Sequence, residues 1–237
     1  MSTIFLVSTR PEGKYSAPKR RYCFSLVNVP VTEVHPADAF TIDEFLRFNA
    51  DVSVFTSSVG SSLFLEKFGL QPVQGTSILC IGRETARPFI EAGAEVTLPA
   101  NHDSAGLAEL LAEKYSNRRI ALLTSDSSNL KLRDFLDREH FIYRYFTLYR
   151  VGKLRPDLSV IGKDDCIGVL LTSPIEASVV IEFLRESGIR PPPIYAIGRT
   201  TADYIETLGF TVSAEVPNSS FAEALSIIDN KICKKGE

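Results

Sequence analysis

Short apolar, β-branched segments alternate along the chain with longer stretches in which apolar residues recur at helical spacing. This alternation is typical of strand–helix–strand units that build a parallel sheet. The strand segments are apolar almost throughout, which indicates burial on both faces of the sheet. The predicted fold class is therefore α/β. The predicted strands are 3–7, 24–29, 52–56, 78–81, 94–98, 119–123, 141–148, 167–172, 193–197 and 210–214.

The predicted helices carry their apolar residues on one face. Leu107 with Leu110 and Leu111 is an example, because this spacing places all three on the same side of a helix. Glycine follows several of these segments, where a helix often ends in a left-handed residue. The predicted glycine helix stops are Gly69, Gly93, Gly188 and Gly209.

The pattern occurs twice. A shift of 116 residues places Thr56-Ser57 on Thr172-Ser173, and Ile81-Gly82-Arg83 on Ile197-Gly198-Arg199. One constant offset along nearly the whole chain predicts two copies of one structural unit. We expect the two units to face each other across a cleft, where a ligand would bind.

Two extended, proline-containing stretches interrupt the alternation, at 30–36 and 149–156. We interpret them as two crossovers between domains, which makes one domain continuous and the other discontinuous. The repeat alone equally allows a single cut near residue 116. The predicted domains are 36–149, and 1–32 together with 154–237.

Composition favours a soluble globular protein, with 44% hydrophobic and 23% charged residues among 237. No apolar run has the length of a membrane span, and the first residues lack the features of a signal peptide, so we expect a cytoplasmic protein. The net charge of −3 argues against nucleic acid as a partner. No repeated apolar seam predicts a subunit interface, so we expect a monomer.

Metal and nucleotide sites are not predicted. The four cysteines form no C-x-x-C pair and are interpreted as reduced, without a metal or disulfide role. The three histidines share no metal-ligand spacing, and no glycine-rich phosphate loop follows a strand. The cysteines and histidines are Cys23, Cys80, Cys166, Cys233, His35, His102 and His140.

Polar residues recur at the predicted carboxyl ends of the strands, where ligands bind in parallel sheets. Each unit would present several helix N-termini there, with free N–H groups suited to an anion that carries many carboxylates or phosphates. Helix capping is the alternative explanation for each serine and threonine. The candidate binding residues are Thr56, Ser57, Ser58, Gly82, Thr85, Ser104, Ser173, Pro174, Gly198, Thr200, Thr201 and Ser220.

Arg10 and Tyr149 are two further candidates. Arg10 follows the first strand and is able to pair with a carboxylate, with a surface ion pair as the alternative. Tyr149 lies at the second crossover and offers a phenolic hydroxyl, with half-buried packing as the alternative. Ser57 and Ser173 are poor nucleophile candidates because no G-x-S-x-G elbow surrounds them.

The same segments resemble uroporphyrinogen-III synthase over essentially the full length. Val59 and residues 124–129 depart from that family's usual pattern. The matching segments are Phe5 to Pro11, Val54 to Ser58, Ile81 to Ala86, Thr147 to Arg150, Leu170 to Pro174 and Ala196 to Ala202.

The resemblance implies two flavodoxin-like, doubly wound domains joined by a two-stranded linker. It also implies a substrate, the linear tetrapyrrole hydroxymethylbilane, which bears many carboxylates. Family chemistry is loss of the ring A hydroxyl, attack by ring D through a spiro intermediate, and closure with ring D inverted. No metal or organic cofactor takes part, and Tyr149 is the residue implied as the proton donor.

Two other functions stay open. A non-catalytic module that binds a tetrapyrrole or another polycarboxylate would keep the fold and lack the reaction, and the departures at Val59 and 124–129 motivate it. A two-lobed solute receptor of periplasmic type would share the double crossover, but the absence of a signal peptide disfavours it.

Overall fold

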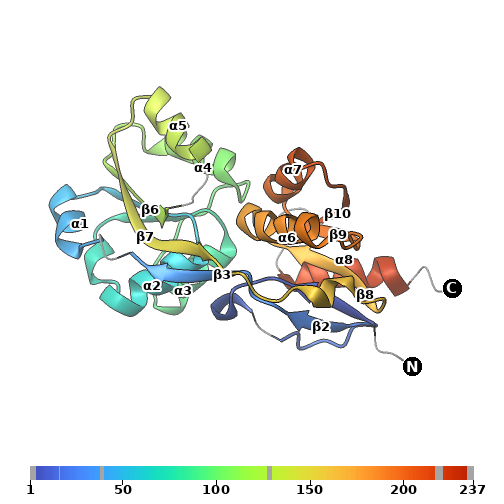
Figure 1. Cartoon of the computed structure of the whole chain (residues 1–237). Coiled ribbons are helices and arrows are strands. Elements are labelled where there is room, and N and C mark those ends of the chain that lie inside the picture. The colour runs from blue at the N-terminus through green and yellow to red at the C-terminus, as the bar shows by residue number, and fades with distance from the viewer. Residues whose placement is uncertain (1–3, 16, 38–39, 127–129, 217–220, 234–237) are drawn as a thin grey trace. The chain divides into compact units, whose positions relative to one another are not determined.

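The computed structural model describes residues 4–15, 17–37, 40–126, 130–216 and 221–233. The chain forms two compact units (Figure 1). Unit 1 combines Met1–Glu33 with Gly152–Glu237, and unit 2 is Val34–Val151. In the described part of the chain, no helix has the length and apolar character that crossing a bilayer requires.

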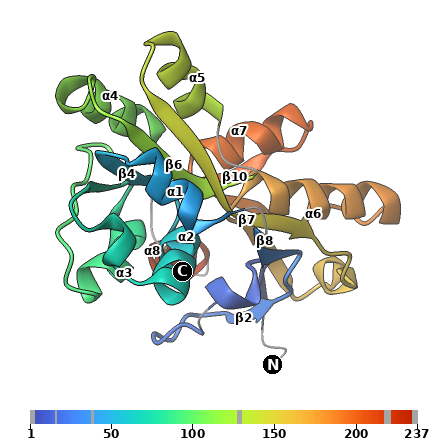
Figure 2. The ribbon, with the colours of Figure 1, turned by 90° about the vertical axis from the view of Figure 1, so that its left-hand side faces the viewer.

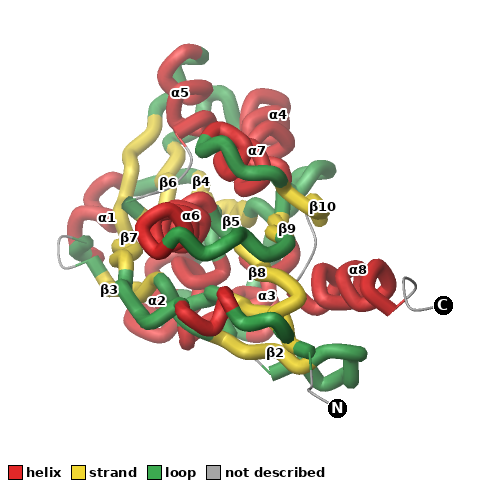
Figure 3. Tube along the Cα trace, turned by 45° about the vertical axis from the view of Figure 1, so that its right-hand side comes forward, coloured by secondary structure: helices red, strands yellow, loops and turns green. Residues whose placement is uncertain are grey.

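Unit 1 is built on a five-stranded sheet in the order β10-β9-β8-β1-β2, and its neighbouring strands pair in parallel. From β8 onwards, strands and helices alternate along the chain (Figure 3). Two short 3-10 turns, Glu12–Lys14 and Ser159–Gly162, lie in the connections. The strands are β1 (Phe5–Ser8), β2 (Ser25–Asn28), β8 (Cys166–Leu171), β9 (Ile194–Ile197) and β10 (Val212–Val216), and the helices are α6 (Pro174–Ser187), α7 (Arg199–Thr207) and α8 (Phe221–Cys233).

Both faces of this sheet are covered. Val180 and Leu184 of α6 and Ile205 of α7 pack with one set of strand side chains. Leu225 and Ile228 of α8 belong to a second cluster, which contains strand residues of the opposite face. The continuous apolar runs of the strands are explained by this double coverage, as expected for a parallel sheet.

Unit 2 is built on a sheet in the order β3-β7-β6-β4-β5, in which β7, β6, β4 and β5 pair in parallel. Strands β3 and β7 each cross the boundary between the units, at Glu33/Val34 and at Val151/Gly152. The strands are β3 (Thr32–Pro36), β4 (Val52–Phe55), β5 (Ser77–Cys80), β6 (Ile120–Ser125) and β7 (Tyr143–Lys153), the helices are α1 (Ile42–Phe48), α2 (Ser58–Phe68), α3 (Arg83–Glu91), α4 (Ser104–Lys114) and α5 (Leu130–Arg138), and a 3-10 turn spans Gln71–Val73.

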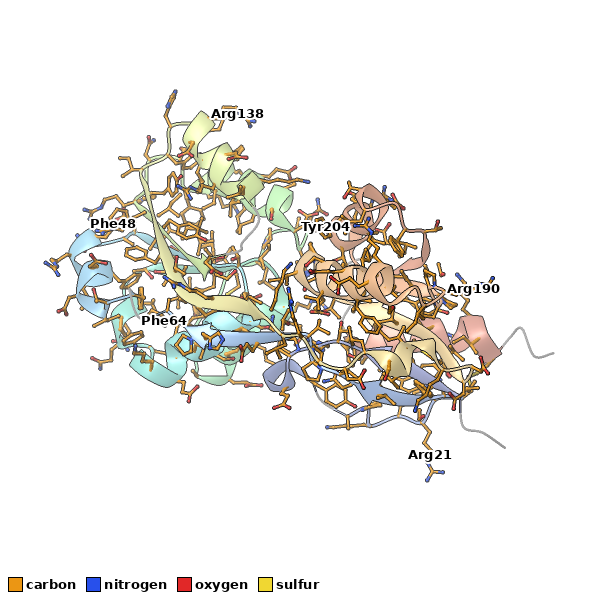
Figure 4. All side chains as sticks on the ribbon, viewed as in Figure 1. Arg21, Phe48, Phe64, Arg138, Arg190 and Tyr204 are labelled. Carbon is orange, nitrogen blue, oxygen red and sulfur yellow. A yellow bond between two sulfur atoms is a disulfide. The ribbon has the colours of Figure 1, made fainter. Side chains whose placement is uncertain are left out.

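The helices of unit 2 also divide between the faces of their sheet, with α2 and α3 on one side and α4 and α5 on the other (Figure 2). Aromatic rings fill the first side: Phe64 contacts Phe45 and Phe55 edge to face. Phe146 and Phe48 extend the same cluster, and Figure 4 labels Phe48 and Phe64 within it. Edge-to-face packing is the geometry that aromatic quadrupoles favour.

The 116-residue shift relates the two sheets strand by strand. It places β4 on β8, β5 on β9, β1 on β6 and β2 on β7, so the four shared strands have the same order in both units. The predicted α/β class with mainly parallel sheets is therefore confirmed. The predicted strand 94–98 is an exception, because only Thr97 bridges to Leu79. Pro99 follows it and has no N–H group to extend the ladder.

The predicted glycine helix stops are confirmed by their backbone angles. Gly69, Gly93, Gly188 and Gly209 all have positive φ, between 65° and 85°. Residues other than glycine are strained in that region, which explains why the four helical segments end there.

The prediction of four reduced cysteines is wrong for two of them. Cys23, before β2, forms a disulfide with Cys233 at the end of α8, and their Cα atoms are 6.6 Å apart. The fold brings together residues that are 210 positions apart, a proximity that spacing along the sequence does not reveal. Cys80 and Cys166 are buried free thiols.

Candidate functional site

Hydroxyl groups gather at the carboxyl ends of the parallel strands in each unit. In unit 2, Thr56 and Ser57 lie between β4 and α2. In unit 1, Thr9 follows β1, while Thr172 and Ser173 lie between β8 and α6. We call these two groups the unit 2 tip and the unit 1 tip. The carboxyl ends of parallel strands are where α/β proteins bind ligands.

Tyr149 is the hydrogen-bond partner of the unit 2 tip. It lies on β7 with 4% of its surface exposed, and its phenolic oxygen donates to Ser57 Oγ at 2.7 Å. Next to it, Thr56 Oγ1 donates to Thr124 Oγ1 on β6 at 2.7 Å. Gly60 lets α2 pack closely against β7, since a Cβ there would lie 3.3 Å from Leu148 Cδ1 and 3.6 Å from Tyr149 Cε1.

Burial raises the pKa of Tyr149 above the ordinary tyrosine value, and hydrogen bonds with Ser57 and Ser125 act in the opposite direction. Asp126 adds to the increase of this pKa. The phenol is therefore protonated at neutral pH. A protonated phenol in a buried hydrogen-bond network is suited to donate a proton to a leaving group.

Ser57 does not cap α2. Its backbone is extended, as in an N-cap residue, but its side chain makes no hydrogen bond to the first turn. The oxygen is bonded to Tyr149 instead. Capping alone, the alternative explanation for Ser57, therefore does not account for this residue. The first N–H groups of α2 have no side-chain cap, and such groups attract anions.

Glu176 is the hydrogen-bond partner of the unit 1 tip. It was not among the residues predicted from the sequence. Its side chain is 3% exposed. Oε1 accepts from the hydroxyls of Thr172 (2.7 Å) and Ser173 (3.0 Å), and Oε2 accepts from the Thr9 hydroxyl (2.8 Å) and the Thr172 N–H (3.0 Å). Ser173 Oγ also accepts from Glu176 N, at 3.4 Å, and so caps α6. The signal in the sequence was Ser173-x-x-Glu176 before an apolar run, the pattern of a capping box.

Two basic residues lie beside the unit 1 tip. Burial lowers the pKa of Lys14, the nearby Glu176 carboxylate raises it, and Arg10 lowers it. The Arg10 guanidinium lies 4.6 Å from the ring centroid of Phe221 on α8. The backbone carbonyl of Arg10 accepts a hydrogen bond from Asn28 Nδ2. The tip therefore combines two cationic groups with one carboxylate.

The repeated Ile-Gly-Arg motif has two different conformations. Gly198 has φ of 77°, so the backbone itself requires glycine, whereas Gly82 is extended at −171°. A Cβ on Gly82 would lie 3.3 Å from His102 Cβ, so this glycine allows a close approach instead. Arg199 pairs with Asp203, Glu206 and Glu215.

The other predicted binding residues differ in accessibility. Thr200 is exposed, while Thr85 and Thr201 are 5% and 3% exposed in the first turns of α3 and α7. Neither helix has a side-chain cap. Ser58, Ser104 and Pro174 are the first residues of α2, α4 and α6. Asp103 rather than Ser104 caps α4, and Ser220 lies outside the described residues.

One group of possible metal ligands occurs among the residues that the structure describes. The donor atoms of Cys23, Asp229 and Cys233 lie within 4.8 Å of one another. The two sulfurs are bonded to each other and are not available as thiolates in this state. This group lies in unit 1 between α8 and the segment before β2.

A cavity of about 330 Å³ lies elsewhere in unit 1, between α6 and α7. Its charged residues balance, since two are basic (Lys153 and Arg185) and two are acidic (Glu182 and Glu186). It contains neither the tip hydroxyls nor Glu176. The residues that line it are Lys153, Ser178, Ile181, Glu182, Arg185, Glu186, Tyr204 and Leu208.

Comparisons with known proteins agree with the duplicated architecture. Among solved structures, a mutant uroporphyrinogen III synthase from Thermus thermophilus is 17% identical with a TM-score of 0.65, covering 98% of this chain and 100% of that chain. Uroporphyrinogen-III synthetase from Helicobacter pylori is 14% identical with a TM-score of 0.67, covering 97% and 100%. These likenesses establish the fold.

The comparison with curated proteins gives no match. The family model described as Uroporphyrinogen-III synthase HemD matches residues 14–225, which is most of the chain and includes the unit 2 tip together with Thr172 and Ser173 of the unit 1 tip. The chain therefore belongs to the uroporphyrinogen-III synthase family of tetrapyrrole biosynthesis.

Proposed function

We propose that this family member is a lyase that cyclises hydroxymethylbilane with loss of water and inversion of ring D. The observation that carries the proposal is the buried hydrogen bond from Tyr149 to Ser57 at the end of β4. It supplies a protonated acid at a strand end where polar ligands bind. No metal or cofactor enters this reaction.

Tyr149 is the proposed proton donor for the ring A hydroxyl as that group departs, with Ser57 passing its own proton to the leaving group as it receives the phenolic proton. The cause of its raised pKa is mainly burial, which disfavours the phenolate. The hydrogen bond to Ser57 holds the phenol, so the donor is fixed before substrate binds. Preorganisation of this kind lowers the barrier without movement of the acid during the reaction.

Substrate carboxylates are proposed to bind at uncapped helix starts. The first turns of α2, α3 and α7 have no side-chain cap, so their N–H groups remain for a ligand. The partial positive charge at a helix start favours a carboxylate there. Arg10 and Lys14 add basic side chains on unit 1.

The energetic demand on such a site is small. The linear substrate also closes unaided to the uninverted isomer, so the enzyme must favour inversion over an easy competing reaction. A 100-fold preference requires about 2.7 kcal/mol of differential barrier lowering. Holding the reacting carbons in a near-attack geometry supplies several times that amount.

The finer description of the fold is also a proposal. Numbered within unit 1 in chain order, the sheet reads 2-1-3-4-5, which is the order of flavodoxin-like doubly wound folds. We regard both units as flavodoxin-like domains, with β3 and β7 as the two-stranded linker. The support is that both strands cross the boundary between the units.

The test generates hydroxymethylbilane in place with the wild-type chain and separates the product isomers. We expect mainly the inverted isomer. In Tyr149→Phe we expect turnover to fall by about 100-fold, the lower end of general-acid contributions, with unchanged folding. Tyr143→Phe is the matched control, because Tyr143 lies on the same strand with its hydroxyl bonded to Asp137 at an exposed site.

Two results would contradict the proposal. Wild-type turnover in Tyr149→Phe would remove Tyr149 from the role of proton donor. Tight substrate binding with only the uninverted isomer as product would favour a non-catalytic tetrapyrrole-binding module of the same fold.

A further inference from the structure

The hydroxyls of the two tips lie at equivalent positions but are hydrogen-bonded to different chemical groups. The 116-residue shift relates Ser57 to Ser173 and Thr9 to Ser125. In unit 2 the Tyr149 phenol donates to Ser57 and lies near Ser125, and in unit 1 the Glu176 carboxylate accepts from Ser173 and Thr9. The duplicated sites have therefore diverged at the group that sets their hydrogen bonding.

Position 176 accounts for one part of this exchange. Its counterpart under the shift is Gly60, which has no side chain and leaves room for the ring of Tyr149. In unit 1 the glutamate side chain fills the corresponding place and reaches the hydroxyls of Thr9, Thr172 and Ser173. Two positions therefore differ between the halves, because Tyr149 corresponds to Glu33 under the shift, and a phenol in one tip is replaced by a carboxylate in the other.

A carboxylate fixes the direction of these hydrogen bonds, because it accepts and does not donate. The single protons of the Thr9, Thr172 and Ser173 hydroxyls all point toward Glu176. What Thr172 and Ser173 offer to a ligand is their oxygen lone pairs. Both residues are partly exposed, whereas Thr9 is fully buried and serves only to hold Glu176.

The unit 2 tip has the opposite polarity. Tyr149 donates to Ser57 Oγ, since the phenol is the more acidic of the two hydroxyls. The proton of Ser57 is then free to be donated, and the uncapped N–H groups of α2 are donors as well. This tip suits acceptors such as carboxylates and the departing hydroxyl.

We propose that the unit 1 tip binds the pyrrole N–H groups of the substrate through Thr172 and Ser173, with Glu176 as the positioning residue. The inference rests on the proposed function, because it assigns one part of that substrate to one site. A pyrrole N–H is a donor without an acceptor, so it matches exposed lone pairs. A substrate carboxylate has no proton for them and would be repelled by Glu176.

The neighbouring cations fit this assignment. A buried carboxylate is stable when it is hydrogen-bonded and has opposite charge nearby, and Glu176 has both, with Lys14 as one neighbour. The tip is therefore preorganised before substrate arrives. The acidic side chains of a pyrrole lie on the carbons away from its nitrogen, so the N–H enters the tip without them.

The test measures binding to the full chain of two probes that do not cyclise. One is a dipyrromethane with acetate and propionate side chains, and the other is the same molecule methylated on both nitrogens. We expect the wild-type chain to bind the N–H probe at least about 10-fold more tightly than the methylated probe. In Glu176→Gln we expect this ratio to fall to about 2, because the amide nitrogen donates and turns a tip hydroxyl outward.

Control variants separate a positioning role from a structural one. Glu182→Gln changes an exposed residue of the same helix and should leave the ratio unchanged. Ser57→Ala should weaken the binding of both probes by a similar factor and leave the ratio as in the wild type. If Glu176→Gln does not fold, Thr172→Val removes one acceptor with little change of shape and should lower the ratio in the same way.

Two results of the probe-binding measurement would contradict the assignment of the unit 1 tip. Equal binding of the two probes by the wild type, or an unchanged ratio in both Glu176→Gln and Thr172→Val, would overturn the inference. The measurement is independent of turnover. A chain that prefers the N–H probe but forms only the uninverted isomer would contradict the proposed function and leave this assignment intact.

Discussion

At the level of single residues, the hydroxyls at the strand ends were foreseeable and their partners were not. Ser57 and Ser173 repeat at a constant offset, so the sequence predicts that both end a strand and begin a helix. Whether such a hydroxyl caps its helix depends on what lies beside it in space. Tyr149 lies on β7, 92 positions after Ser57 in the sequence, and Ser57 forms a hydrogen bond with it instead of capping α2.

Alkaline pH should reveal the burial of Tyr149. Its folded pKa is raised, while the unfolded chain titrates at about 10, so above that pH the unfolded state loses the proton first. The stabilisation is complete below about pH 10 and is lost as pH rises through the folded pKa. We expect the free energy of unfolding in urea to fall less between about pH 9 and 11 in Tyr149→Phe than in the wild type.

The same alkaline series contains its own control. Tyr143→Phe removes a phenol that is much less buried, so its pH dependence should stay closer to that of the wild type. An identical alkaline loss in the wild type and in Tyr149→Phe would contradict the burial of an un-ionised phenol at this position.

Gly198→Ala should destabilise unit 1. The φ of 77° with ψ of 151° is a region that essentially only glycine adopts, so alanine there costs about 1–3 kcal/mol in the free energy of unfolding. Gly13→Ala is the matched control, because Gly13 has no atom within 4 Å of an added Cβ and no positive φ. Equal unfolding midpoints in urea for the two variants would refute the requirement for glycine at position 198.

At the level of elements, the periodic pattern predicts the strands and helices because burial on both sheet faces demands continuous apolar runs. The glycine stops were readable for the same local reason, since only the backbone of that residue decides them. Segment 94–98 has strand composition, but its hydrogen bonding depends on a partner and on Pro99. Pairing is a property of the fold, and so is the Cys23–Cys233 disulfide.

The disulfide should stabilise the attachment of α8. It closes a very long loop, and disulfides of this kind typically contribute about 2–4 kcal/mol to the free energy of unfolding. We expect reductant to lower the stability of the wild type and to have no effect on Cys23→Ser. Amide exchange should quicken in α8 while α4, which belongs to unit 2, keeps its protection.

Two outcomes would contradict this account of the disulfide. One is an unchanged stability of the wild type in the presence of reductant, and the other is an equal loss of stability in the wild type and in Cys23→Ser. Cys80 and Cys166 are buried thiols in both proteins, so they do not produce the expected difference.

At the level of the whole molecule, the duplication explains the fold and underlies the different roles that we propose for the two tips. The internal repeat predicts two equivalent sheets, and their shared strand order bears this out. The repeat also suggested two equivalent anion sites. The repeated serines and threonines are similar in the two halves, but the hydrogen-bonding polarity of the two tips differs. Glu176 in place of the glycine of the other half gives the unit 1 tip a polarity that a search for repeated serines and threonines does not find.

The central claim is that substrate binds at the strand tips. The most direct measurement is backbone amide exchange with and without a linear tetrapyrrole that lacks the ring A hydroxyl and does not cyclise. We predict slower exchange at the starts of α2 and α6, next to Ser57 and Ser173. Protection confined to the cavity between α6 and α7, near Glu182 and Tyr204, with both tips unchanged, would contradict the account.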